Sequence, residues 1–222
     1  MRRSAIALGI VCLGLLAAPA LADLLAGWSF DSLSIPSGTT GTDYGPIASD
    51  GAGEIFGGNA YGHHANSATV WSSPVGNGSA RSFSSNTWTA GDYYQFQTST
   101  LGYESILFGW DQTRSNTGPQ TFDLEYSLDG INFYVVVDDY TVNAVTWSSV
   151  PPPKPESTFG PFAIPTAAEN QPVVYFRLTS QVTPSNTAGT NRVDNILVYG
   201  TLIPEPAGLL LLASGVWTLR RR

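Results

Sequence analysis

The chain has 222 residues, of which 12% are charged and 12% are aromatic, with 23 glycines and 15 prolines. This composition excludes a disordered chain, which is rich in charge and poor in aromatic residues, and it predicts one globular domain of short strands and many turns. Between residues 23 and 203 there are sixteen acidic and five basic residues, so this part carries a net charge of −11 and is not expected to bind nucleic acid or anionic lipid.

Residues 1–22, MRRSAIALGIVCLGLLAAPALA, have the three parts of a secretory signal peptide. Two arginines precede an apolar run over residues 5–18, and Ala20 and Ala22 stand where signal peptidase requires small side chains. We therefore predict a removable signal helix, cleavage before Asp23 and export of the protein. The apolar run is short for a retained membrane span.

Cys12 is the only cysteine and lies inside this apolar run. It follows Val11 in the middle of the run, which is not the position of a lipoprotein acceptor cysteine. After cleavage the mature chain is expected to have no thiol, and therefore no disulfide, thiolate metal site or cysteine nucleophile.

Residues 23–202 are expected to form the folded domain, because apolar side chains alternate there with a period of two between turn residues. The expected strands include LLAGWSF, DYYQFQT, ESILFGWD, TFDLEYS, VVYFRLTS and RVDNILVYG. A strand with one apolar face must bury it against another layer, so we predict an all-β, two-sheet antiparallel sandwich. A jelly-roll-like order is favoured over an immunoglobulin-like one, whose cysteine pair is missing.

Four segments depart from this alternation. Residues 34–85 are rich in turn residues and are expected to be long loops with one or two strands inside. Asp129-Gly130 predicts the tight turn of a β-hairpin over residues 120–137. Residues 151–155, PPPKP, predict an exposed connection, and residues 165–171, PTAAENQ, predict one or two helical turns.

Few residues offer catalytic chemistry. His63 and His64 are the only histidines, and we expect a solvated loop pair rather than metal ligands. Asp123 and Glu125 share one strand face at about 6.5–7 Å, near the separation of glycosidase carboxylates, but such carboxylates are expected all over an acidic protein. The sequence shows no nucleophile elbow and no serine beside a histidine, so we expect no enzyme activity and no catalytic residues.

A structural calcium site is the one metal hypothesis. Asp31, near the first strand, and Asp194 or Asn195, in the last strand, offer oxygen ligands that converge if the two chain ends pair. No other metal or cofactor is expected.

The tryptophans have two interpretations. Trp71, Trp88 and Trp147 lie in or near loop-rich stretches, where they either stack on sugar rings or, as we favour, fill the core or its rim. Trp28 and Trp110 follow strand patterns and are expected in the core.

Two stretches of the body resemble a known module. LEYSLDGINFYVV is similar to the Y-S-x-D-G-x-x-F hairpin of galactose-binding-like and related jelly-roll modules, and RVDNILVYG is similar to their final strand. This resemblance implies a sandwich fold and a tendency toward carbohydrate ligands.

The chain ends in PEPAGLLLLASGVWTLRRR. Residues 207–219 carry no charge and would reach about 20 Å as a helix, against about 30 Å for the hydrocarbon core of a bilayer. Pro204 and Pro206 interrupt regular structure before this run. The last three residues suit the cytoplasmic side of a membrane: Arg220, Arg221 and Arg222.

This ending, in a chain with a signal peptide, resembles the sorting segment of PEP-CTERM proteins. The resemblance implies that residues 203–222 hold the exported protein in the inner membrane of a Gram-negative bacterium that makes extracellular polysaccharide. It also implies that an exosortase recognises Pro204, Glu205 and Pro206 and cleaves nearby. The apolar run is shorter than most tails of this family.

The sequence therefore predicts an exported, non-enzymatic protein of the cell envelope or extracellular matrix. Its expected partners are an exosortase-like processing enzyme and the membrane. The alternative is a carbohydrate-binding module whose ligand is exopolysaccharide, and a third hypothesis, an enzyme, would need paired carboxylates in a deep pocket.

Overall fold

The computed structural model describes residues 22–204. The signal helix and the C-terminal apolar helix that the sequence predicts lie outside these residues. No helix in the described part is both long enough and apolar enough to cross a bilayer. Its helices are two single turns, η1 (Pro155–Ser157) and η2 (Thr166–Ala168), and η2 lies in the segment where the sequence predicts a helical turn.

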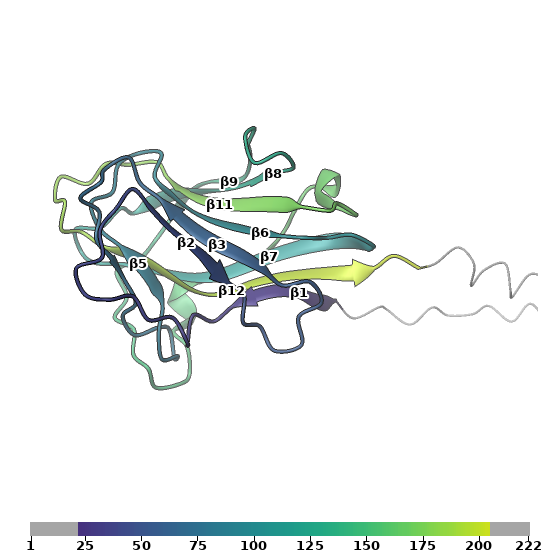
Figure 1. The fold of residues 1–222 in the computed structure, drawn as a ribbon, viewed down its shortest axis with the longest axis horizontal. Helices are drawn as coiled ribbons and strands as arrows, with labels where there is room; N and C mark the ends of the chain where they lie inside the picture. The colour runs from purple at the N-terminus through teal and green to yellow at the C-terminus, as the bar shows by residue number, and fades with distance from the viewer. Residues whose placement is uncertain (1–21, 205–222) are drawn as a thin grey trace, which may run out of the picture.

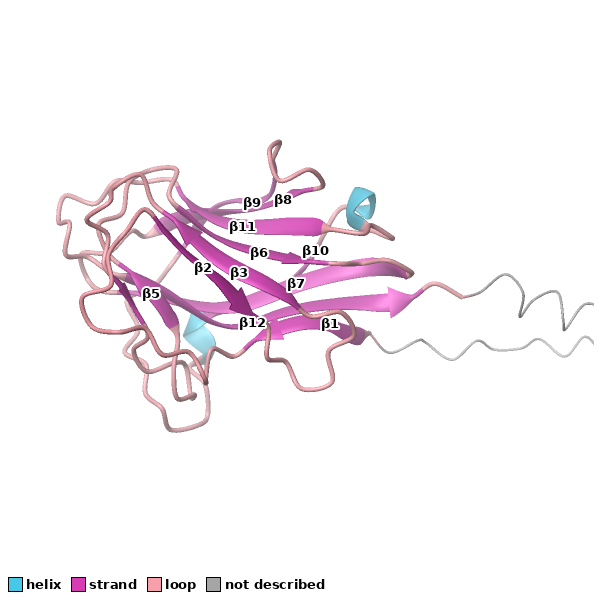
Figure 2. Cartoon of the chain, in the orientation of Figure 1, coloured by secondary structure: helices cyan, strands magenta, loops and turns pink. Residues whose placement is uncertain are grey.

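Two antiparallel sheets form the body (Figure 1), and Figure 2 shows how little of the chain is helical. The first sheet has the spatial order β10 (Thr158–Ala163), β7 (Tyr103–Arg114), β12 (Asn191–Leu202), β5 (Phe83–Ser85), β4 (Trp71–Ser72), with β1 (Asp23–Trp28) also paired to β12. The second sheet has the order β2 (Asp43–Ala48), β3 (Gly58–His63), β6 (Tyr93–Thr98), β11 (Val174–Ser180), β8 (Thr121–Ser127), β9 (Tyr134–Thr141). The prediction of an all-β, two-sheet antiparallel sandwich is confirmed.

Aromatic rings from both sheets fill the space between the layers. Phe108 of β7 stacks on Phe176 of β11 at 4.8 Å between ring centroids, and Trp28 of β1 meets Phe96 of β6 at 5.4 Å. Each of these side chains is at most 1% exposed, because the period of two directs every second residue inward. The core also contains four tryptophans, two from strand patterns and two from loop-rich stretches of the sequence: Trp28, Trp110, Trp71 and Trp88.

The expectation of one or two strands in residues 34–85 is wrong, because this part contains β2, β3, β4 and β5. Glycines hide the pattern of β3. A Cβ on Gly62 would collide with the Trp71 indole, and one on Gly58 would collide with the backbone carbonyl of Gln97 on β6 and lie 2.9 Å from Trp28 Cζ2. Small residues therefore stand at these positions of β3 because tryptophan rings, and at Gly58 also the backbone of β6, occupy the space beside them.

The predicted hairpin over residues 120–137 is confirmed as β8 and β9, with Tyr126 opposite Tyr134. Its turn is held by Asp129, whose carboxylate accepts hydrogen bonds from the backbone N–H groups of Ile131 and Asn132 at 2.9 and 2.8 Å. These bonds lower the pKa of Asp129 below its usual value, and the bond from the Asn132 N–H has the largest effect, followed by that from Ile131.

Candidate functional site

The outer face of the second sheet carries rows of half-exposed aromatic and polar side chains. Strand register sets Tyr61, Gln95, Arg177 and Glu125 side by side across β3, β6, β11 and β8. The two flanking rows contain Asn59, Gln97 and Tyr175 on one side, and His63, Tyr93 and Thr179 on the other. We call the residues of these three rows the tyrosine–arginine face.

Arg177 is fixed at the centre of this face. Its Nε donates to Gln95 Oε1 at 2.9 Å, and its Nη2 donates to the Tyr93 hydroxyl at 3.1 Å. The guanidinium carbon lies 3.8 Å from the centroid of the Tyr93 ring and 3.6 Å from that of Phe133. Burial lowers the pKa of Arg177 from its usual value. The guanidinium is thus oriented before any ligand arrives.

Neighbouring contacts also hold three other side chains of the face, those of His63, Thr179 and Glu125. The His63 ring stacks on Tyr93 at 5.1 Å and 29°, and His63 Nδ1 lies 2.7 Å from Asp43 Oδ1. Thr179 Oγ1 donates to Glu125 Oε2 at 2.5 Å. Hydrogen bonding to His63 is the largest cause that lowers the pKa of Asp43. Side chains whose rotamers are already set lose less entropy on binding.

The face offers a sugar both kinds of contact that it needs. Amide, guanidinium and hydroxyl groups are donors and acceptors for ring hydroxyls, and tyrosine rings offer flat apolar surfaces with a polar edge for the C–H side of a pyranose. Neighbouring strands lie about 4.8 Å apart, so an extended ligand that crosses them meets a new side chain at each strand.

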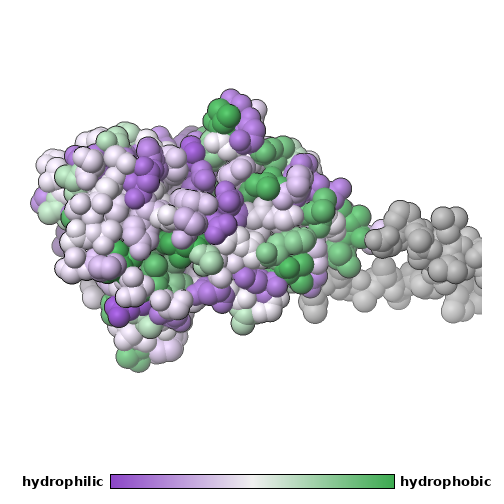
Figure 3. Space-filling view, in the orientation of Figure 1, coloured by the Kyte–Doolittle hydropathy of each residue, from purple (hydrophilic) through white to green (hydrophobic). Residues whose placement is uncertain are grey.

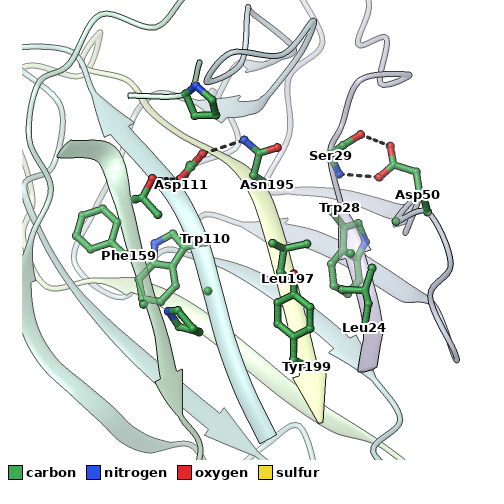
Figure 4. Close-up of a pocket in the computed structure, with 18 residues that line it drawn as sticks. Leu24, Trp28, Ser29, Asp50, Trp110, Asp111, Phe159, Asn195, Leu197 and Tyr199 are labelled. Carbon is green, nitrogen blue, oxygen red and sulfur yellow. Dashed lines mark hydrogen bonds between the residues drawn. The ribbon is translucent and has the colours of Figure 1, made fainter. Parts of the chain in front are cut away.

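A separate cleft of about 810 Å³ lies on the outer face of the first sheet. Figure 4 shows Leu197 and Tyr199 of β12 in this cleft, with the core residues Trp110 and Trp28 on either side of them in the view. Its lining is mainly apolar. Gly109 of β7, the cross-strand partner of Leu197, has no side chain to fill the space beside that leucine. At the rim, Ser29 Oγ donates to Asp50 Oδ2 at 2.8 Å, so this carboxylate is already engaged.

A buried polar network closes one end of this cleft. Asn195 Nδ2 donates to Asp111 Oδ2 at 2.8 Å, and Asn77 Nδ2 donates to the same oxygen at 2.9 Å. Asp194 is fully buried and accepts bonds from Ser79 Oγ and the N–H of Asn77. Burial, with the Asp111 charge as a smaller cause, raises the pKa of Asp194 to about 7.

The residues of the calcium hypothesis contact one loop instead of one another. Asp31 Oδ1 accepts a hydrogen bond from the N–H of Ala80 at 2.7 Å, and Asp194 Oδ2 accepts one from Ser79 Oγ at 2.6 Å. The structure therefore brings Asp31 and Asp194 to neighbouring residues of the loop that precedes β5. Calcium binding by this group stays a prediction.

The expectation of a solvated histidine pair is wrong. His63 belongs to β3, and His64 is fully buried, with its ring centroid 4.9 Å from that of Trp71 and 4.3 Å from that of Trp88. The two ring nitrogens of His64 lie near Ser85 Oγ, at 2.9 Å, and near Asp92 Oδ2, at 3.1 Å. The approach to Asp92 does not meet hydrogen-bond geometry, so the two groups form a close polar contact.

This arrangement places a serine, a histidine and an aspartate in the order of a hydrolase triad, which the sequence does not predict. Ser85, His64 and Asp92 are 1%, 0% and 2% exposed, and none of them lines the cleft described above. A triad acts on a carbonyl that reaches the serine oxygen. The burial of all three side chains leaves no path for a substrate, so we interpret the group as structural.

Asp123 and Glu125 lie on one face of β8, as predicted, but they have different surroundings. Asp123 is 7% exposed and forms, with Asp138 and Asp139, a set of carboxylates whose oxygens lie within 4.8 Å of one another. Burial, and then the charges of Asp138 and Asp139, raise the pKa of Asp123. Glu125 instead belongs to the tyrosine–arginine face.

The tryptophans expected in the core or at its rim do lie there. Trp71, Trp88 and Trp147 are 1%, 3% and 3% exposed, so none offers a ring face to a sugar. Of the processing residues, Ala22 and Pro204 are exposed and outside any strand. The others lie outside the described residues: Ala20, Glu205, Pro206, Arg220, Arg221 and Arg222.

Sequence reasoning missed the tyrosine–arginine face, although a signal for it exists. The alternation that assigns Tyr94 and Phe96 to the core directs Gln95 to the opposite side of β6. The same holds for Tyr175 and Arg177 on β11. What the alternation does not give is the strand order that makes these residues neighbours.

No protein-family model and no curated protein matches the chain. The chain is similar to the CBM22-1 xylan-binding domain of Paenibacillus barcinonensis Xyn10C, with 12% identity and a TM-score of 0.45, over 83% of this chain and 99% of that one. It is also similar to CtCBM11, with 15% identity and a TM-score of 0.37, over 75% of this chain and 99% of that one. A third similar structure is the K2 cleaved adhesin domain of Lys-gingipain, with 12% identity and a TM-score of 0.37, over 60% and 83%.

Proposed function

We propose that the protein is an exported, non-enzymatic module that binds a neutral polysaccharide on the tyrosine–arginine face. One observation carries the proposal: Arg177 is fixed between two aromatic rings, beside Gln95 and in one row with Tyr61. Side chains that are oriented, half-exposed and rich in both hydrogen-bonding groups and ring surfaces are the parts of a sugar-binding surface.

The first-sheet cleft supports this function less well. Its lining is mainly apolar, and the carboxylates at its rim are bound to neighbouring groups, so it offers few polar contacts for hydroxyls. The acidic body also disfavours anionic polysaccharides, because sixteen acidic residues face five basic ones between residues 23 and 203.

Matched tyrosine variants separate the two surfaces. Tyr61 of the face and Tyr199 of the cleft are both half-exposed tyrosines on a strand of their sheet. Binding of the purified protein to a panel of neutral polysaccharides is measured by affinity electrophoresis. We expect Tyr61→Ala to weaken binding about tenfold or more, and Tyr199→Ala to leave it unchanged.

Two other outcomes contradict the proposal. Loss of binding in Tyr199→Ala alone would place the ligand in the cleft. Absence of binding to every polysaccharide in the panel would favour a structural role in the envelope or matrix.

Export and sorting form the second part of the proposal, supported by the sequence of the two chain ends. We propose that the signal peptide is cleaved after Ala22 and that the C-terminal segment then holds the protein in the inner membrane. An exosortase recognises Pro204–Pro206 and cleaves nearby. Mass spectrometry of the mature protein from its native cells tests both steps. Recovery of secreted, soluble protein with Arg222 intact would contradict the sorting step.

A further inference from the structure

Exposed apolar side chains gather at the end of the body where β1 begins and β12 ends. Figure 3 shows apolar surface at this end. Five large side chains of this region are exposed, by 39–55%: Ile55, Phe56, Leu101, Val173 and Leu202. A single exposed leucine needs no explanation, but a group of this size on one end of a protein marks an interaction surface. We call these five residues the apolar tip.

Backbone and ring contacts make one side of the tip continuous. Ile55 donates its N–H to the carbonyl of Leu24 at 3.0 Å, which fixes the loop before β3 against β1. The Phe56 ring meets Tyr103 edge-on at 5.7 Å, and Tyr103 is the cross-strand partner of Leu202. These contacts connect the loop to the ends of β7 and β12.

Two backbone hydrogen bonds connect Leu101 and Val173 to the rest of the tip. The residue after Leu202 donates its N–H to the carbonyl of Gly102, next to Leu101, at 2.9 Å. Thr100 donates its N–H to Gln171 at 2.9 Å, in the loop that leads to Val173. Loops from both sheets therefore present apolar side chains at the same end of the sandwich.

Four of the five basic side chains of the described part are bound away from the tip, and the fifth, Lys154, is an exposed residue of the loop that contacts Asn77. Arg114 contacts the segment after β9, Arg177 lies in the tyrosine–arginine face, and Arg192 and Arg81 donate to the loop before β5. Within the described residues, the acidic residues closest in sequence to the tip are Glu54, Glu104 and Glu169. The partner of the tip is therefore apolar and carries no strong negative charge.

Both ends of the described chain emerge beside this surface (Figure 1). Asp23, the first residue of β1, pairs with Gly200 of β12, and β12 ends at Leu202. The uncharged run of residues 207–219 begins a few residues further along the chain. This run thus starts five residues after Leu202 of the tip, which favours one shared environment for the two apolar parts over two separate ones.

We propose that the apolar tip rests in the interfacial layer of a lipid bilayer with neutral headgroups, so that the sandwich stands on this end. Apolar side chains that enter the boundary between headgroups and acyl chains bury surface without spanning the membrane. This inference does not depend on sugar binding, because the tyrosine–arginine face uses none of the five tip residues.

Site-specific fluorescence tests the proposal on the full chain in vesicles of neutral phosphatidylcholine. In a Cys12→Ser background, one chain carries Leu101→Cys and a matched control carries Val150→Cys, both labelled with the same environment-sensitive dye. Leu101 is 55% exposed and Val150 is 69% exposed. Val150 is not a tip residue: it lies in the loop after β9, where the carbonyl of Ser148 accepts a hydrogen bond from the N–H of Gly78. Neither substitution removes a buried side chain.

We expect a quencher attached to the lipid acyl chains to quench the Leu101 label roughly threefold or more strongly than the Val150 label, since tip residues reach the acyl boundary. Adding Ile55→Ser and Val173→Ser to the Leu101→Cys chain should reduce this quenching toward the control value. The second comparison separates insertion of the tip from simple tethering by the neighbouring apolar segment.

Two results would overturn the proposal. One is equal access of an aqueous quencher to both labels, together with weak quenching from the acyl chains. The other is a tip-dependent change in oligomeric state, measured by analytical ultracentrifugation in detergent, without any change in lipid quenching. That result would assign the tip to contact with a second copy of the chain.

Discussion

Arg177 shows how much of the proposed surface depends on the geometry of one side chain. Its planar guanidinium makes two hydrogen bonds to β6 side chains while it stacks between Tyr93 and Phe133. A lysine carries the same charge but has neither the plane nor the fixed fork of donors.

We therefore predict that Arg177→Lys weakens polysaccharide binding about tenfold while the unfolding temperature changes by only a few degrees. Isothermal titration calorimetry and thermal unfolding measure the two effects. Arg81→Lys, at an exposed arginine that donates to a backbone carbonyl, is the matched control. Equal affinity of Arg177→Lys and the native protein would remove Arg177 from the site.

Asp194 makes stability depend on pH. Burial raises its pKa from the ordinary 3.8 to about 7, so the folded protein holds a proton that the unfolded chain has already lost between these values. Its contribution to stability is fully present below pH 3.8 and is lost as the pH rises through about 7. The loss is at most about 1.4 kcal/mol per pH unit.

We predict that the free energy of unfolding of the native protein, measured with urea, declines from about pH 4.5 to about pH 7.5. The Asp194→Asn variant should show a flatter profile. Asp50→Asn, which changes an exposed carboxylate, should keep the native slope. An unchanged slope in Asp194→Asn would show that another group titrates in this range.

The Ser85–His64–Asp92 group allows a direct test of the non-enzymatic proposal. A fluorophosphonate reacts with a serine that a histidine activates, provided that the reagent reaches the oxygen. Because all three side chains are buried, we predict that the folded protein shows no adduct by mass spectrometry. Labelling that disappears in Ser85→Ala would contradict the structural interpretation.

At the scale of single strands, β3 depends on a glycine that the core requires. A Cβ on Gly62 would collide with the Trp71 indole, whereas one on Gly109 of β7 would meet its nearest atoms at 3.4 Å, an ordinary contact. We predict that Gly62→Ala lowers the free energy of unfolding by about 2 kcal/mol or more, and that Gly109→Ala is neutral or stabilising by about 0.5 kcal/mol. Denaturant unfolding of both variants checks this, and equal stability would contradict it.

The same strand explains which parts of the fold the sequence predicts well. Strands with large inward side chains, such as Phe96 in β6 and Phe108 in β7, show their period directly and are predicted correctly. β3 fills its inward positions with Gly62 and Ala60, so its pattern becomes visible only when the neighbouring tryptophans are known.

The candidate site was harder to predict than the fold for a related reason. Tyr61 and Arg177 are far apart in the sequence, and only the order β3, β6, β11 brings them to one surface. The burial of His64 likewise depends on Trp71 of β4 and on Trp88 in the loop after β5. Local patterns give strands and faces, but pairing between distant strands decides which faces act together.

At the scale of the whole molecule, the negative charge of the body constrains its ligand. Binding of a neutral sugar displaces few counterions, so we predict that affinity changes less than about twofold between roughly 20 and 500 mM NaCl. Titrations at both salt concentrations measure this. An affinity that falls steeply with salt would indicate an anionic ligand paired with Arg177.

The position of β12 also determines when the body can assemble. β12 lies between β7 and the strands β1 and β5, and within residues 22–204 β12 is the strand with which β1 pairs. A ribosome releases β1 first and β12 last. Strand β1 therefore has no pairing partner in the first sheet until β12, the last strand, has been synthesised. Long-range pairing of this kind delays closure until nearly the whole chain is free. For the proposed export, this means that the first sheet can close only after β12 has crossed the membrane.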